Sequence, residues 1–485
     1  MKQIKNIIHI FLQPFRSENG LNVGLLLIFI LINCIVFLNA YLHDPQIGYD
    51  AISHLRYIET LSKLQLVRPE DSVEYFSPPL PYVFPALLSS LTGMNVRWAA
   101  KMSQYLNFFL SIGSTWYLIK VCDLINTKST QKLGALVFLG MLPVYYKTFA
   151  FIRGEPYVVF FAMAMVYYTL LIIIKEQYTI ANGIVLGVFM GLSALSRQWG
   201  FFLFPSIFLF FTYKWFCLPR WRKSIAKIIS LCLVFIVAIS GWFYISLNQR
   251  YGSITAFNRE VRPQLSLKNQ PWKFYIGVSP EVLFRNPIRP LFSNQFIPIF
   301  YSEMWGDYWG YFSIYGIDTR KPVFLDTYKV IDVLSEGRQP DWLKTNYETI
   351  GSYLGRVNII SIFPSLLIPV SFIFTVIAIL SRRINGLFTI QQKELYSFLL
   401  LTICTICAGY LWFLIMYPNL VYGDNIKATY LLHVFPIIGI LVGGFFEYIN
   451  KKSKYIFRTI IGGLGLIFIH NLSTIITHYR LYLLN

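Results

Sequence analysis

Apolar runs long enough to cross a lipid bilayer recur along most of this 485-residue chain. A transmembrane helix needs roughly 20 consecutive, mostly apolar residues. We expect about eleven spans, at residues 21–41, 102–119, 133–149, 157–174, 180–196, 200–213, 229–247, 359–380, 395–416, 429–447 and 458–476. The fifth and sixth are short and could instead form one hairpin of half-depth helices. The pattern predicts an all-α integral membrane protein.

Composition excludes several other classes of protein. Only 13% of the residues are charged and 55% are hydrophobic, whereas soluble domains carry roughly 25% charged residues. The net charge of +19 would suggest nucleic acid on a soluble protein, but no basic run is interleaved with exposed aromatic residues. We therefore expect membrane lipids, and no nucleic acid, as partners. The long hydrophilic segments contain no cysteine, so no disulfide framework is predicted.

The basic residues of the short loops orient the helices. Segments 120–132, 214–227 and 451–458 are rich in lysine and arginine, whereas the short turns near 147–156, 197–200 and 417–428 carry only Lys147, Arg153, Arg197 and Lys427. Basic short loops belong on the cytoplasmic side. We therefore expect a cytoplasmic N-terminus and an uncleaved first helix at 21–41.

Two outer segments, 42–101 and 248–358, are long. Loops of this length are usually functional or carry structure of their own. We expect an N-terminal membrane module at 1–247 that holds outer loop 42–101 and the active site, an extracytoplasmic loop region at 248–358, and C-terminal transmembrane helices at 359–485.

The first outer loop opens on a carboxylate and an imidazole. Apolar residues at 52, 55, 58, 61 and 64 predict a helix lying against the membrane surface. Asp50 and His54 are four residues apart and share one face of that helix, which suits proton abstraction or metal binding. Asp50 could equally cap the helix while His54 is an ordinary interfacial residue.

A proline-rich stretch, Pro78-Pro79-Leu80-Pro81-Tyr82, follows in the same loop. Proline disfavours a regular helix start at this density and fixes an extended chain. The apolar stretch 82–92 is too short to span, so we expect a re-entrant or surface helix. A plain proline-rich connector is the alternative.

A second acidic turn, Arg153-Gly154-Glu155-Pro156, precedes the fourth span. Proline in the first helical turn and an acid beside it are typical of a helix start. If Glu155 and Asp50 face one cavity, the pair could instead hold a divalent cation such as Mg²⁺ or Mn²⁺.

Arg197 and Lys427 lie at outer helix ends. Such cations can simply extend to the headgroup level, or they can converge with Arg153 on a phosphate. The segment around Trp305, Asp307 and Trp309 is unusually aromatic. It suits either a sugar ring or anchoring at the membrane interface.

Together these motifs resemble the GT-C superfamily of polytopic glycosyltransferases, in particular the branch with protein O-mannosyltransferases and the lipid A aminoarabinose transferase. The resemblance covers roughly 21–215 well and 425–440 loosely. It rests on Tyr49-Asp50, the Pro78–Tyr82 run, Arg97, Arg153-Gly154-Glu155-Pro156, Ser193–Gln198, and Lys427–Leu432 followed by Pro436.

The resemblance implies inverting transfer of a sugar from a polyprenyl-phosphate donor to a glycan, lipid or protein acceptor on the extracytoplasmic face. Asp50 would be the general base, with Glu155 orienting the acceptor or sharing a cation. Arg153, Arg197 and Lys427 would stabilise the lipid phosphate. Support would come from His54, Arg56 and Tyr82, and acceptor contacts from Trp305, Asp307 and Trp309.

Localisation would be the bacterial plasma (inner) membrane, or the endoplasmic reticulum if the source is eukaryotic. A transporter or flippase of lipid-linked sugars is the main alternative function. It predicts functional charges within spans and inverted halves, whereas the acids here cluster in the outer loops. A sugar-repeat polymerase or ligase, or a non-catalytic assembly protein, is a more remote alternative.

Overall fold

The computed structural model describes residues 11–17, 20–46, 48, 50–125, 128–285, 287, 292, 294–306, 341–380, 388–420 and 423–477. Across this part of the chain the fold is helical, as expected, apart from one two-stranded antiparallel sheet. Its strands are β1 (Arg16–Ser17) and β2 (Gly20–Leu21), just before the first long helix.

The helices of the N-terminal half follow one another with short connections. They are η1 (Gln13–Phe15), α2 (Val23–Leu42), α3 (Ala51–Ser62), α4 (Leu80–Thr92), α5 (Val96–Asp123), α6 (Ser129–Gly140), α7 (Pro143–Ala150), α8 (Glu155–Ile174), α9 (Ile180–Ser196), η2 (Gln198–Leu203), α10 (Phe204–Cys217), η3 (Pro219–Trp221), α11 (Arg222–Ile236), η4 (Val237–Gly241) and α12 (Trp242–Tyr251).

The second half contains short helices and then long ones. They are η5 (Leu267–Asn269), α13 (Trp272–Ile276), α14 (Pro280–Arg285), α15 (Phe296–Trp305), α17 (Asp341–Ile360), α18 (Ile362–Leu380), α19 (Ile390–Met416), η7 (Ala428–Val434), α20 (Phe435–Lys452), α21 (Lys454–His470) and α22 (Leu472–Ile475).

Seven helical segments of the described chain are long and apolar enough to cross a membrane, or eight if the bent pair α6–α7 is one span. This supports a multi-pass membrane protein but does not confirm a count of about eleven. The predicted span 102–119 lies in α5, whose mean hydropathy is too low for α5 to count as a candidate membrane span. The span at 180–196 is a 17-residue helix, and 458–476 divides into α21 and α22 at Asn471.

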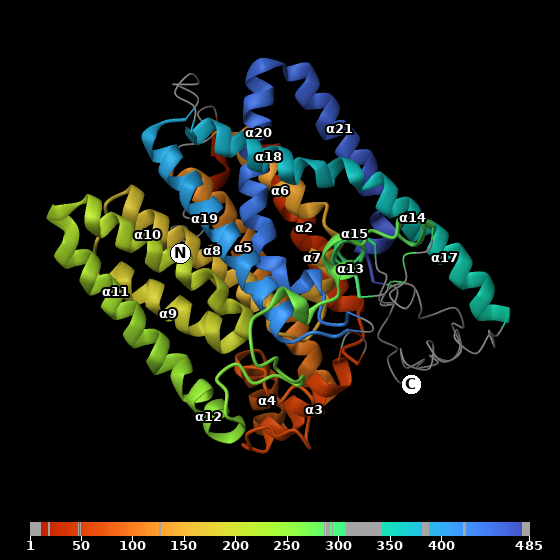
Figure 1. The fold of residues 1–485 in the computed structure, drawn as a ribbon. Coiled ribbons are helices and arrows are strands. Elements are labelled where there is room, and N and C mark those ends of the chain that lie inside the picture. The colour runs from red at the N-terminus through yellow and green to blue at the C-terminus, as the bar shows by residue number, and fades with distance from the viewer. Residues whose placement is uncertain are drawn as a thin grey trace.

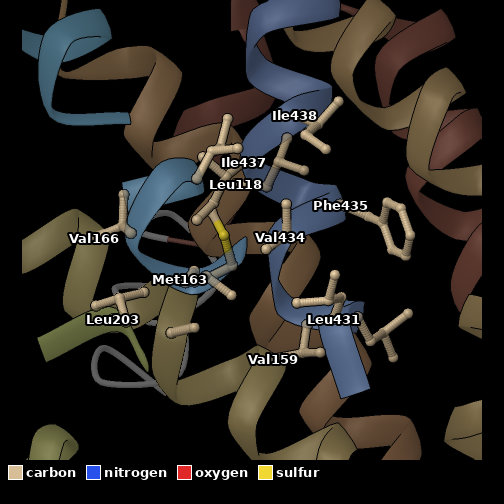
Figure 2. Close-up of a cluster of buried hydrophobic side chains, with 14 of the residues drawn as sticks. Leu118, Val159, Met163, Val166, Leu203, Leu431, Val434, Phe435, Ile437 and Ile438 are labelled. Carbon is tan, nitrogen blue, oxygen red and sulfur yellow. The ribbon is translucent and has the colours of Figure 1, made fainter. Parts of the chain in front are cut away.

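The helix η7–α20 forms the centre of the bundle (Figure 1). Within the apolar window of Ala428–Lys452, 94% of the residues are buried. Figure 2 shows Leu431, Val434 and Ile437 of this helix among side chains of α5 and α8. Gly443 lets α20 approach α6, because a Cβ there would collide with the carbonyl oxygen of Gln131.

The predicted span 133–149 is broken rather than straight. Its two halves, α6 and α7, meet at an angle of 65°, and Pro143 occupies the first turn of α7. Proline begins a helix well but cannot continue one. Buried amides of α5 bind the carbonyls freed where α7 ends: Gln104 donates to Ala150 at 2.8 Å, and Asn107 donates to Phe149 and Phe151 at 3.0 and 2.8 Å.

These amides explain why α5 is more polar than a lipid-facing helix. With no water in the bilayer core, exposed backbone groups must find partners inside the protein. The polar face of α5 points into the bundle and fixes the turn that follows α7. That turn carries Arg153 and leads into the candidate site.

The segment predicted as the first outer loop contains two short helices, at the lower edge of Figure 1. The predicted surface helix is α3, and the predicted short apolar helix is α4. In contrast to the expected extended entry, α4 starts at Leu80, inside the proline run. Pro79 already has helical torsion angles, and Pro81 falls in the first turn, where its missing N–H has no intrahelical partner to lose.

Candidate active site

Two arginines and a glutamate from the start of α8 and the end of α9 form one buried cluster. The Arg153 Nε lies 2.7 Å from Glu155 Oε2, and Arg197 Nε lies 3.2 Å from Glu155 Oε1. The indole of Trp199 also donates to Glu155 Oε1, at 3.3 Å. The structure therefore brings together Arg153, Glu155 and Arg197, which the sequence analysis placed at one membrane face.

Close backbone approach makes this cluster possible. Gly154 packs so tightly against the end of α9 that a Cβ would collide with the carbonyl oxygen of Ser196. Glu155 then becomes the first residue of α8, with Pro156 beside it in the first turn. The sequence Arg153-Gly154-Glu155-Pro156 therefore starts α8 and also binds the end of α9, where Arg197 lies.

Glu74, which sequence reasoning missed, completes the cluster. Its Oε2 lies 2.8 Å from Arg197 Nη1, and it also accepts a hydrogen bond from the Ser77 hydroxyl. Nothing in the sequence separates Glu74 from Glu70 and Asp71, which lie a few residues earlier in the same loop. Only the fold shows that Glu74 is buried and that Glu70 and Asp71 are not.

The cluster contains two positive and two negative side chains, all at most 4% exposed. Burial alone would raise the pKa of Glu74, but the charge of Arg197 outweighs it and holds that pKa well below its usual range. Burial opposes the charge of Arg197, yet Glu155 and Glu74 raise the pKa of its guanidinium. These side chains consequently stay ionised and hold the connections around them in place.

A second ion pair lies beside the cluster and is more accessible. Lys427 Nζ lies 3.4 Å from Asp50 Oδ2, with side-chain exposures of 8% and 44%. The ammonium also lies 5.6 Å from the ring centre of Tyr430, whose ring is 4.5 Å from that of Trp199. The start of η7, at Lys427, thus meets the start of α3, at Asp50, next to the Glu155 cluster.

Asp50 itself has an unusual backbone. It precedes α3 with φ of 56° and ψ of 19°, in the left-handed region, and its side chain makes no capping bond. Aspartate tolerates this conformation better than most residues, at some energetic penalty. The capping role considered for Asp50 is therefore not seen, and its carboxylate faces Lys427.

His54 is buried on the inner face of α3. Its Nδ1 lies 2.8 Å from the hydroxyl of Tyr82, and the ring of Tyr57 stacks on that of Tyr82 at 4.2 Å. Its Nε2 is buried and has no hydrogen-bond partner among the described residues. Burial lowers the pKa of His54 to about 4, so the imidazole is neutral near pH 7. Arg56, on the same helix, is exposed to solvent.

A metal shared by Asp50 and Glu155 does not fit these side chains. Both oxygens of Glu155 accept from guanidinium groups, and Asp50 faces an ammonium. A cation there would have to displace positive charge already in place. The described residues contain no group of three or more histidine, cysteine, aspartate or glutamate side chains arranged for a metal.

The aromatic segment divides into two parts. Trp305 is fully buried, and its indole N–H donates to the Ser365 hydroxyl of α18 at 2.7 Å. It therefore packs in the core and offers no exposed face to a sugar, which removes the basis for an acceptor role. Asp307 and Trp309, the other two acceptor candidates, lie outside the described residues.

Comparison with solved structures finds similar membrane enzymes at low identity. The oligosaccharyltransferase of Archaeoglobus fulgidus, in its apo form, matches with a TM-score of 0.47 and 14% identity, over 95% of this chain and 57% of that chain. ArnT from Cupriavidus metallidurans bound to undecaprenyl phosphate matches with a TM-score of 0.35 and 13% identity, over 87% of this chain and 78% of that chain.

A third match is the Archaeoglobus fulgidus oligosaccharyltransferase AglB in complex with an inhibitory peptide and a dolichol-phosphate, with a TM-score of 0.41 and 11% identity. It covers 95% of this chain and 57% of that chain, so the present chain spans little more than half the length of these oligosaccharyltransferases. No family model matches the sequence, and no curated protein matches it.

Proposed function

We propose that this chain is a membrane glycosyltransferase that moves a sugar from a polyprenyl-phosphate donor to an acceptor on the extracytoplasmic face, with inversion. The observation that carries the proposal is the ion pair between Asp50 and Lys427. It combines an accessible carboxylate with a cation at an outer helix end, and it adjoins a charge-balanced cluster that can hold both in place. The motif resemblance to GT-C enzymes supports the same reaction class.

In this reaction the acceptor hydroxyl oxygen attacks the anomeric carbon of the donor sugar. The carboxylate of Asp50 takes the hydroxyl proton. The bond between the anomeric carbon and the phosphate oxygen breaks, and its electron pair leaves with the lipid phosphate. Lys427 offsets the charge on that departing phosphate. One displacement at the anomeric carbon inverts its configuration.

The two arginines and Glu155 receive a positioning role in this proposal. Because Arg153 and Arg197 are 2% exposed or less and already bind Glu155, direct contact with a phosphate would require those ion pairs to open. Lys427 is more accessible than either arginine, and its ammonium already lies beside the accessible carboxylate of Asp50. His54 and Tyr82 support the helix that begins at Asp50.

The experiment is a transfer assay in proteoliposomes that contain the full chain and a panel of polyprenyl-phosphate sugars. Glycosyl transfer predicts free polyprenyl phosphate and a new glycosidic bond on added acceptors. Movement of intact donor across the bilayer, without release of polyprenyl phosphate, would instead indicate the transporter class and contradict the proposal.

A further inference from the structure

Glu303 is a buried carboxylate that the roles above do not use. It lies on α15, which packs against both α7 and η7 (Figure 1). The side chain is 1% exposed. Its Oε2 accepts a hydrogen bond from the backbone amide of Ala428 at 2.7 Å. Its Oε1 is buried and has no hydrogen-bond partner among the described residues.

A carboxylate with a single hydrogen bond is unfavourable in the interior unless another interaction compensates its charge. Here the compensation comes from the helix start. Ala428 is the first residue of η7, which continues directly into α20, and unpaired amides at a helix N-terminus favour negative charge. Glu303 therefore binds the beginning of the central helix.

The residue immediately before this helix, its N-cap, is Lys427. The Tyr410 hydroxyl accepts from the Lys427 amide at 2.7 Å and lies 3.1 Å from the Lys427 carbonyl oxygen, to which it can donate. Glu303 binds the next amide along the chain. The backbone is thus held on both sides of the residue whose ammonium reaches Asp50.

The helix that carries Glu303 is itself anchored. Asn358 of α17 donates to the Ser302 hydroxyl at 3.1 Å, and Trp305 donates to Ser365 of α18 at 2.7 Å. These bonds bracket Glu303 in the sequence. Its carboxylate is therefore a rigid support, because α15 cannot rotate without breaking them.

We propose that Glu303 is a positioning residue for Lys427, so that its carboxylate sets where the donor phosphate is bound. The inference rests on the proposed function, in which Lys427 contacts that phosphate. Its consequence is that removing Glu303 and removing Lys427 weaken phosphate binding through one shared interaction.

The test is a double-mutant cycle with farnesyl phosphate as a soluble probe of isoprenyl phosphate binding to the full chain in detergent. Glu303→Leu leaves the Ala428 amide unsatisfied and should weaken binding about ten-fold. Glu303→Gln keeps an acceptor but loses the charge, so we expect about three-fold. In a protein that already carries Lys427→Ala, either Glu303 change should weaken binding by less than about two-fold, because residues that act through one interaction have non-additive effects.

Glu281→Gln is the matched control, because Glu281 lies on the neighbouring α14 in a pair with Arg285 in which both side chains are 78% exposed. It should leave affinity unchanged.

If Lys427→Ala weakens binding while both Glu303 variants bind as wild type, or if the effects multiply in the double variants, the positioning role is overturned and the proposed function stands. If Lys427→Ala binds as tightly as wild type, the phosphate role of Lys427 fails and this inference fails with it. Should Glu303→Leu not fold, the Glu303→Gln arm decides alone.

Discussion

The ammonium of Lys427 lies 3.4 Å from the carboxylate of Asp50, although 377 positions separate the two residues in the sequence. This contact joins the loop after the first helix to the start of the central helix. It depends on the neighbouring cluster, because Trp199 contacts both Glu155 and Tyr430, and Tyr430 lies beneath Lys427.

Removing one partner of the buried cluster should destabilise the protein strongly. Glu74→Gln leaves the buried Arg197 without one of its two carboxylates, and breaking a buried pair in this way costs about 3 kcal/mol or more. We expect a clear fall in the thermal midpoint of the purified protein. Glu281→Gln, in an exposed pair, should change stability by no more than about 0.5 kcal/mol. Equal midpoints for the two variants would contradict the buried network.

Stability should depend on pH through His54. The folded pKa is about 4, against an ordinary value of 6.5, so the unfolded chain binds the proton first as pH falls. The part of the free energy of unfolding that depends on a neutral His54 is therefore fully present above pH 6.5. It is lost between pH 6.5 and about 4 and amounts to roughly 3 kcal/mol in total. Denaturation midpoints measured between pH 4 and 8 should show this slope. His54→Gln should flatten it in that window, and an unchanged slope would show that His54 is not the group responsible.

Gly154 should tolerate no side chain. A Cβ there would collide with the carbonyl oxygen of Ser196, so Gly154→Ala must push α9 away from Glu155, at a penalty of about 1–3 kcal/mol. Glycosyl transfer should fall with stability. Gly463→Ala is the opposite case, because nothing lies within 4 Å of its Cβ position in α21. It should be neutral or stabilise by up to about 1 kcal/mol. Similar outcomes at both glycines would refute the close approach.

Asn107 of α5 should control the turn that carries Arg153. Asn107→Leu removes the two hydrogen bonds that Asn107 donates to the carbonyls of Phe149 and Phe151, which costs about 1–3 kcal/mol. We expect faster hydrogen exchange over residues 149–155 and weaker transfer. Asn182→Leu serves as the control, because the side-chain amide of Asn182 donates to the Gln177 carbonyl in a solvent-exposed hydrogen bond. Wild-type exchange in Asn107→Leu would contradict this support.

Apolar periodicity and helix-end residues predicted much of this site. The helix that follows Asp50 and the short apolar helix at 82–92 follow from local patterns, although the second begins earlier, at Leu80. The helix-end positions of Arg153 and Arg197 left two alternatives open, and convergence was one of them. Glu74 could not be predicted, since its burial depends on Arg197, which lies 123 residues away. The polar face of α5 obscured the span count for the same reason, as its amides bind carbonyls of α7 that only the fold brings near.

The role of Asp50 as general base is tested most directly by Asp50→Asn in reconstituted proteoliposomes. The amide keeps the size of the side chain but cannot take the acceptor proton. We predict a fall in glycosyl transfer of about 100-fold or more, with farnesyl phosphate bound at least as tightly as in wild type, because the anion that competes for Lys427 is gone. Transfer at the wild-type rate in Asp50→Asn would contradict the mechanism.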